Sequence, residues 1–346
     1  MKNRNLKLFK FICAAGLTVT LAACKHGKPA GDIDLKAAYP EKTLVLQEIA
    51  KAIEYVPLEP ADSILMDDQA LPIYVSEKRI VVADVNRGDI FVFKGDGRNI
   101  AAFNRKGQGP EEYDFIHSAV YDEAAGEIFV LTFRKFLVFS ETGNYRRTLA
   151  FPEKSSNLHL FDFGGDTLLG YDRMSLFNDK MLEKPYLLLS KKDGQPVGEL
   201  DISFAERYSN SVKSESGMFT AGGPGNWCFG KDFIISDYSS DTVFKLTRDK
   251  KITPLLVRTP SVRRNNPRIF LSPIFSTDKF IYFARFSIDY ASIVEKNGID
   301  MDRDVNYDNL WYDLATGESY GKVTLTNADS ECMFYIESLA SDEANT

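Results

Sequence analysis

The sequence predicts an all-β fold, a six-bladed β-propeller, and three observations carry this prediction. Phe and Tyr are abundant, with 25 and 16 among 346 residues, and aromatic residues favour strands. Five segments share one pattern: an alternating apolar strand, a polar turn and a second strand, the signature of a β-hairpin. A further strand precedes each hairpin, so the repeating unit is a small sheet.

The period of this unit distinguishes a propeller from other β folds. The hairpin segments are Ile90–Phe103, Phe136–Phe151, Leu187–Leu200, Val243–Leu256 and Leu310–Val323. The strands before them are RIVVADV, EIFVLTF, DTLLGYD, DFIISDY and FIYFARF. The turn residues Gly97, Gly143, Gly194, Lys250 and Gly317 are separated by 46, 51, 56 and 67 residues. A β-sandwich lacks such a period and a parallel β-helix has a much shorter one, whereas a group of strands ending in a hairpin that recurs every ~45–65 residues indicates a propeller blade.

A sixth blade is predicted from the two ends of the domain. Tyr55–Leu58 supplies one strand and Cys332–Ile336 another. Joining head and tail in one sheet removes exposed strand edges.

The N-terminus has the pattern of a secretory signal. Four basic residues, Lys2, Arg4, Lys7 and Lys10, precede an apolar run that ends at Ala23, with no acidic residue before Cys24. The run is too short for a spanning helix. Leu21 to Cys24 resemble a bacterial lipobox, which predicts acylation of Cys24; the alternative is plain secretion with an unmodified cysteine.

Three regions follow from these signals. Residues 1–23 are the expected signal peptide, residues 24–40 the lipidated N-terminus and a flexible tether rich in Gly, Pro and charge, and residues 41–346 the propeller. Several acyl chains on one residue anchor a protein stably. We therefore expect the membrane to be a partner through this anchor.

The net charge of the protein limits the classes of partner that it can bind. Removal of residues 1–23 takes away four basic groups and no acidic ones, so the formal charge changes from −7 to −11. An acidic protein is poorly suited to nucleic acid, which we exclude as a partner. The residues after Cys24 include Lys25 and Lys28 and lack an acidic surface-export signal. We expect an outer-membrane lipoprotein that faces the periplasm rather than the cell surface.

Two cysteines, Cys228 and Cys332, belong to the expected domain and lie 104 residues apart. An exported protein can form disulfides, yet this spacing alone does not imply one. Two separately buried thiols are the favoured interpretation.

The segment NRKGQGPEEYDF, Asn104 to Phe115, invites comparison with a phosphate-binding loop. Glu112 stands where a dinucleotide fingerprint needs glycine, and an extended segment follows instead of a helix. Pro110 removes a backbone donor, and two glutamates would repel a phosphate. We interpret the segment as a turn between blades, in which Gly107 and Gly109 allow positive φ or close backbone approach and Pro110 stiffens the exit.

A family resemblance rests on this segment. The run Gly107, Gln108, Gly109, Pro110, Glu111, Glu112, Tyr113 resembles the G-x-G-P-x-E-Y segment of six-bladed β-propeller lipoproteins of Gram-negative anaerobes, relatives of the NHL-type propellers. EYVPLE (Glu54 to Glu59) is similar to that family's opening strand, and SDYSSDTVFKL (Ser236 to Leu246) to a later blade. The resemblance implies the propeller fold. It transfers no catalytic residue to this chain, and the propeller fold by itself does not choose among activities.

The sequence contains few residues that could act as catalytic groups or metal ligands. The domain offers only His117 and His159 besides His26 of the tether, and each fits a strand or loop histidine better than a metal ligand. Neither a nucleophile elbow nor a zinc-protease helix motif occurs. We therefore expect no catalytic residue and no cofactor.

The sequence also offers a possible calcium loop and two possible aromatic ligand platforms. Asp300, Asp302, Asp304 and Asp308 resemble part of a calcium loop, but Val305 replaces its glycine and Trp311 its closing glutamate. A solvated acidic loop is the favoured interpretation. Trp227 and Trp311 lie in or beside long insertions and are candidate ligand platforms, although propellers also bury such rings between blades.

Function is predicted as a class rather than a ligand. We expect a lipid-anchored binding or scaffold module of the cell envelope, with a protein, peptide or glycan as its ligand. An alternative is a lactonase or lyase with a metal in the central channel. A third is an accessory protein that binds glycan or peptide for an envelope transport system.

Overall fold

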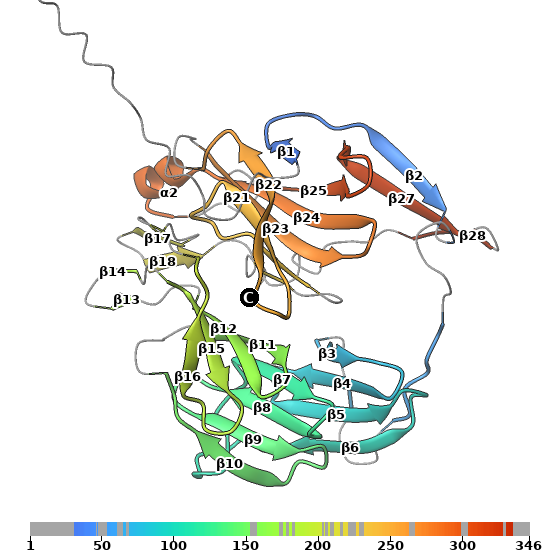
Figure 1. Cartoon of the computed structure of the whole chain (residues 1–346), viewed down its shortest axis with the longest axis vertical. Helices are drawn as coiled ribbons and strands as arrows, with labels where there is room; N and C mark the ends of the chain where they lie inside the picture. The colour runs from blue at the N-terminus through green and yellow to red at the C-terminus, as the bar shows by residue number, and fades with distance from the viewer. Residues whose placement is uncertain are drawn as a thin grey trace, which may run out of the picture.

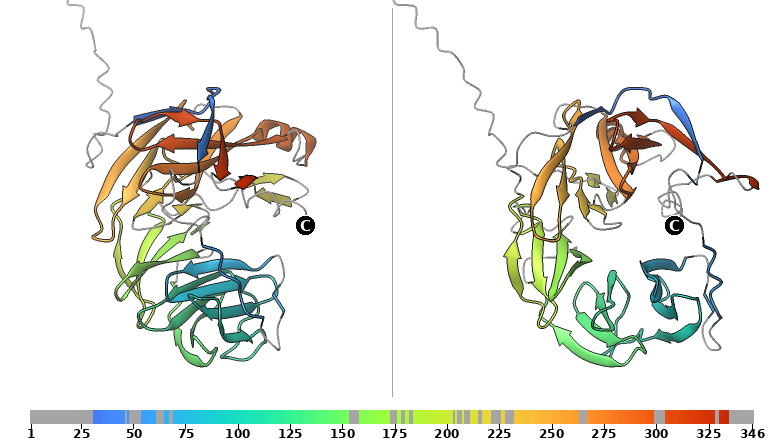
Figure 2. Two further views of the ribbon diagram at one scale, coloured as in Figure 1. Left: turned by 90° about the vertical axis from the view of Figure 1, so that its right-hand side faces the viewer. Right: turned by 45° about the vertical axis from the view of Figure 1, so that its right-hand side comes forward.

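The computed structural model describes most of the chain from Gly31 to Phe334. The described residues are 31–45, 47, 54–60, 65–66, 69–152, 158–172, 176–177, 180–181, 184–202, 204, 207, 211–214, 217–220, 226–227, 232–262, 267–298, 304–327 and 330–334. They form mostly antiparallel sheets that follow one another around a common centre (Figures 1 and 2). The fold is a six-bladed β-propeller.

The first three blades have four strands each. Blade one contains β3 (Leu71–Val75), β4 (Arg79–Asp84), β5 (Asp89–Lys94) and β6 (Asn99–Asn104). Blade two contains β7 (Ser118–Asp122), β8 (Glu127–Leu131), β9 (Phe136–Ser140) and β10 (Tyr145–Leu149). Blade three contains β11 (Leu158–Gly164), β12 (Thr167–Asp172), β15 (Tyr186–Ser190) and β16 (Pro196–Glu199). The first strands of neighbouring blades, β3, β7 and β11, contact one another, so they are the inner strands.

The next two blades repeat this order. Blade four contains β19 (Asn226–Trp227), β20 (Phe233–Ile235), β21 (Thr242–Leu246) and β22 (Ile252–Thr259), with β1 (Gly31–Asp34) added at its outer edge. Blade five contains β23 (Arg268–Ser276), β24 (Phe280–Ile288), β25 (Val305–Asp313) and β26 (Ser319–Tyr320). All five predicted hairpins, and the strand before each, are confirmed as the second, third and fourth strands of these blades.

Strands from both ends of the chain form the sixth sheet. It contains β2 (Glu41–Val45), β27 (Lys322–Asn327) and β28 (Ser330–Phe334). The predicted N-terminal strand was wrong, because Tyr55–Leu58 forms no strand. Val56 and Leu58 instead pack on the apolar face of blade one, where β-sheet pairing is not needed to bury them.

The predicted tether contains ordered structure. Gly31–Asp34, within residues 24–40, pairs in parallel with Leu256–Thr259, and Ile33 is fully buried. Between β1 and β2 the chain crosses blade five, where Arg285 donates hydrogen bonds to the carbonyls of Leu35 (3.1 Å) and Ala37 (2.9 Å). Residues 31–45 therefore form an N-terminal strap across blades four, five and six.

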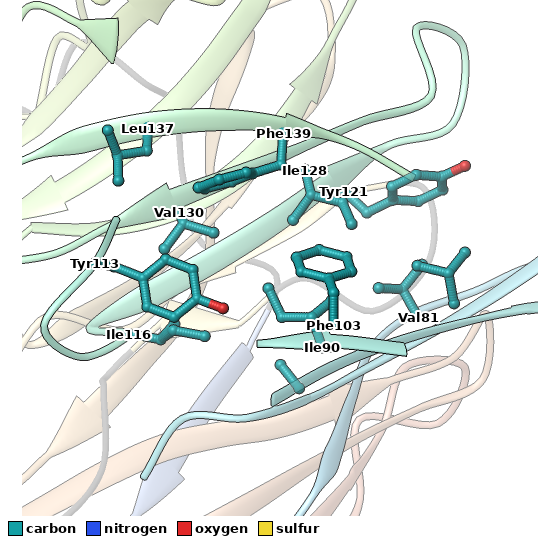
Figure 3. Close-up of a cluster of buried hydrophobic side chains, with 12 residues drawn as sticks. Val81, Ile90, Phe103, Tyr113, Ile116, Tyr121, Ile128, Val130, Leu137 and Phe139 are labelled. Atoms are coloured by element: carbon teal, nitrogen blue, oxygen red, sulfur yellow. The ribbon is translucent and has the colours of Figure 1, made fainter. Parts of the chain in front are cut away.

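Apolar side chains fill the spaces between neighbouring blades. Figure 3 shows the cluster between blades one and two, in which Ile90 and Phe103 face Ile128 and Phe139. Alternation along each strand sends side chains to both faces of a blade, and each face meets a neighbour. The same packing recurs between the following pairs of blades. The core thus consists of the successive interfaces between neighbouring blades, from blade one to blade six.

The five hairpin turns share one backbone conformation. All five predicted turn residues have positive φ: Gly97 (87°), Gly143 (75°), Gly194 (77°), Lys250 (66°) and Gly317 (74°). Four are glycine, for which this conformation carries no steric cost. Lys250 adopts it without that freedom.

Candidate functional site

The two ends of the propeller differ in their connections. At one end, hereafter the turn end, the hairpin turns around Gly97, Gly143, Gly194, Lys250 and Gly317 are short. The other end, hereafter the loop end, carries the longer connections 105–117, 173–185, 200–225 and 289–304. Loops hung on a rigid scaffold usually bind ligands. The loop end is therefore the candidate functional face.

Small added elements occur within three of these longer connections. They are the hairpins β13 (Leu176–Phe177) with β14 (Lys180–Met181) and β17 (Ser211–Ser214) with β18 (Gly217–Thr220), and helix α2 (Tyr290–Lys296). They gather on one side of the molecule (Figure 1), and α2 contacts β17. Insertions of different blades thus meet at the loop end.

The glycine-rich segment is a closed turn that leads from blade one into blade two. The Tyr113 amide donates to the Arg105 carbonyl (3.1 Å), and the Gly107 amide donates to the Tyr113 carbonyl (2.9 Å). Tyr113 is fully buried, and its hydroxyl donates to the Gly88 carbonyl (2.8 Å). Burial raises the pKa of Tyr113 to about 12, so the hydroxyl remains a donor at neutral pH.

Glu112 closes the tip of this turn. Its carboxylate accepts a hydrogen bond from the Gly109 amide (2.8 Å) and would overlap a β-carbon at position 107. Lys135 of blade two donates to the carbonyls of Gly109 (2.6 Å) and Glu112 (2.7 Å). Groups of the segment itself and Lys135 of blade two therefore pair these polar atoms, as a structural turn requires.

Four ring side chains adjoin the turn at the loop end. Phe115 contacts Phe133 with ring centroids 4.7 Å apart, Phe133 contacts His117 at 4.8 Å, and His117 contacts His159 at 4.9 Å. Phe133 is 54% exposed. We call these four residues the ring cluster. They come from the connection into blade two, from the β8–β9 turn and from inner strand β11, so they join blades two and three.

A buried charged cluster lies between blades three and four. The Tyr171 hydroxyl donates to Asp237 Oδ2 (2.9 Å), and Arg207 lies 3.7 Å from the same oxygen with its side chain only 2% exposed. Arg258 donates to the Asp237 carbonyl (2.6 Å). Burial lowers the pKa of Arg258 to about 10, so it stays charged at neutral pH.

This charged cluster fixes an insertion to the blades. Arg207 belongs to the 200–225 connection, and it also donates to the Asp172 carbonyl (3.0 Å) at the end of β12. Buried charges are tolerated where partners compensate them. Sequence reasoning missed this cluster and the ring cluster, because their members lie far apart in the chain and form no motif.

Comparison with known families fits this architecture. The model of a family described as "Domain of unknown function (DUF4934)" matches residues 30–337. The chain belongs to the DUF4934 family. No curated protein sequence matches it.

Solved structures similar to this DUF4934 chain have low sequence identity. A protein from Bacteroides fragilis described as exported is 14% identical, with a TM-score of 0.51, over 81% of this chain and 78% of the other. A DUF4221 family member from Bacteroides vulgatus is 14% identical, with a TM-score of 0.47, over 77% and 83%. Virginiamycin B lyase from Staphylococcus aureus is 11% identical, with a TM-score of 0.38, over 70% of each chain. At such identities the likeness concerns the fold alone.

The predicted calcium ligands of this DUF4934 domain divide between separate partners. Asp304 is buried and accepts a hydrogen bond from the Ser292 hydroxyl of α2 (2.9 Å). Asp308 pairs with Arg285, whose Nε lies 2.6 Å from its Oδ1. Asp300 and Asp302 lie outside the described residues. The described part of the chain brings no three His, Cys, Asp or Glu side chains together as a metal cluster.

The structure describes only some of the predicted ligand platforms and cysteines. Trp311 is 2% exposed and packs against Phe275 and Tyr282, so it presents no ring face to a ligand. The side chain of Trp227, at β19, lies outside the described part, as do Cys24 and Cys228. Cys332 lies in β28. Within the described residues, no helix has the length and hydropathy needed to cross a membrane.

Proposed function

We propose that this protein is a lipid-anchored binding module of the cell envelope, and that the loop end of the propeller holds its ligand. The difference between the two ends carries the proposal. Insertions from blades three and five and the exposed Phe133 gather at the loop end, whereas hairpin turns close the turn end. Half-exposed aromatic side chains on rigid scaffolds are typical anchors of binding sites.

Location rests on the N-terminal pattern. Four basic residues, an apolar run and the Leu21–Cys24 lipobox support export and acylation at Cys24. The structurally similar B. fragilis protein is described as exported, which agrees with this location. We place the protein at the outer membrane, facing the periplasm.

A variant at Cys24 tests the anchor. Cys24→Ser should move the protein from the membrane fraction to the soluble envelope fraction and remove the acyl mass from its N-terminus. Cys13→Ser is the matched control, because residue 13 is lost with the signal peptide. Membrane retention of Cys24→Ser, or release of both variants alike, would contradict acylation.

Arrays of glycans and peptides test the binding face. Phe133→Ala should abolish binding, whereas Leu314→Ala should not, because Leu314 is 37% exposed at the turn end. Equal loss in both variants would move the site away from the loop end. An array that retains neither protein on any glycan or peptide would count against the binding proposal itself.

A further inference from the structure

We infer that His117 and His159 together bind one divalent transition-metal ion, such as Zn²⁺, at the loop end beside Phe133. The chain has three histidines, and the third, His26, lies in the N-terminal segment. Both domain histidines therefore meet in one place, although they are 42 residues apart and belong to different blades. Imidazole is the commonest protein ligand of such ions.

The separation of the two rings fits one shared ion. With metal–nitrogen bonds of about 2.0–2.1 Å and angles of about 90–110° at the ion, two coordinating imidazoles have centroids about 4.5–5.2 Å apart. The observed separation is 4.9 Å, and the ring planes are inclined by 49°. Parallel stacking would align the planes, whereas this inclination is compatible with nitrogen atoms that converge on one point.

The backbone on both sides of the pair is held in place. The His117 amide donates to the Leu131 carbonyl (2.8 Å), and the next residue, Ser118, accepts a hydrogen bond from the Leu160 amide (3.0 Å). That contact joins blade two directly to the residue after His159, which itself pairs with Tyr171 across β11 and β12. Fixed backbone on two rigid blades preorganises the imidazoles for an ion.

Two protein ligands leave the coordination shell open. The described residues supply no group of three metal-ligating side chains, so water or a ligand atom would complete the shell. The ring centroid of Phe133 lies 4.8 Å from that of His117, so an aromatic side chain adjoins the proposed site. This inference goes beyond the proposed function, because the ion can bind whether or not the loop end holds a glycan or peptide.

Calorimetric titration of the mature acylated protein in detergent with ZnCl₂ tests the site. We expect one ion per chain, and at least a tenfold loss of affinity in His117→Ala and in His159→Ala. His26→Ala is the matched control and should bind as the wild type does. Zinc should also raise the melting temperature of the wild type and not that of the double variant, since binding to the folded state stabilises it.

Copper provides a measurement that does not depend on stability. The electron paramagnetic resonance spectrum of the Cu²⁺-loaded protein should show two imidazole nitrogens on one ion, and one nitrogen in either single variant. Unchanged zinc affinity in the double variant would place the metal elsewhere, for example on the cysteines. A spectrum with a single nitrogen in the wild type, or no zinc binding at millimolar concentration, would overturn the inference.

Discussion

Lys250 and Gly194 occupy the same position of the outer hairpin in neighbouring blades, and both have positive φ, 66° and 77°. The position demands a left-handed backbone because the tight turn between the last two strands of a blade requires it. Glycine adopts this conformation freely, whereas other residues lose about 1–2 kcal/mol. Blade four therefore stores strain that its neighbours avoid.

Lys250→Gly should stabilise the protein by about 1 kcal/mol, because relief of this strain outweighs the greater freedom of glycine in the unfolded chain. Urea unfolding measures the change. Gly317→Lys is the matched control: φ is 74° there, and the nearest atom to an added β-carbon lies 3.6 Å away, so backbone strain alone should destabilise it. A destabilised Lys250→Gly would contradict this explanation.

Arg285→Met should destabilise the protein by about 2 kcal/mol. The change removes two hydrogen bonds from the charged guanidinium to the carbonyls of Leu35 and Ala37, and each such bond contributes about 1.5–3 kcal/mol. Packing of the methionine side chain in the same place offsets part of this loss. Asp308→Asn is the control and should cost less than about 1 kcal/mol, because Asp308 is half exposed. Equal losses in urea unfolding would show that the strap gains little from Arg285.

Tyr113→Phe should lower stability by about 1–3 kcal/mol at pH 8, since the hydroxyl donates to Gly88 and accepts from the Arg105 amide (2.9 Å). The folded-state pKa of Tyr113 is about 12, above the unfolded value near 10. Its contribution is therefore complete below pH 10 and is lost as the pH rises toward 12. Unfolding free energies of both proteins should converge over that interval; a constant gap would refute the assignment.

Gly107→Ala should destabilise the protein by about 1–3 kcal/mol, because the new β-carbon would overlap the Glu112 carboxylate. In a Glu112→Ala background the same change should cost at least about 1 kcal/mol less, since the obstacle is gone. The four unfolding energies form a double-mutant cycle. Additive costs would mean that position 107 needs glycine for another reason.

Much of the fold could be predicted from local patterns. Alternating apolar residues placed the second, third and fourth strands of five blades, and the five residues predicted at the hairpin turns all have positive φ. Each of these features depends on a few neighbouring residues. The sixth sheet was not assigned correctly in this way, because its N-terminal strand was predicted at Tyr55–Leu58, and only the pairing of Glu41–Val45 with β27 identifies the strand that belongs there.

The candidate site likewise combines features that depend on neighbouring residues with contacts that depend on the tertiary structure. The sequence by itself determined the blades, their turns and the N-terminal export pattern, because alternation, turn chemistry and charge act over short distances along the chain. Only the tertiary structure decided that His117 meets His159, that Arg207 reaches Asp237, and that Trp311 is buried. Those contacts join different blades or depend on how blades pack, and the position of one blade against the next is set by the whole ring of interfaces.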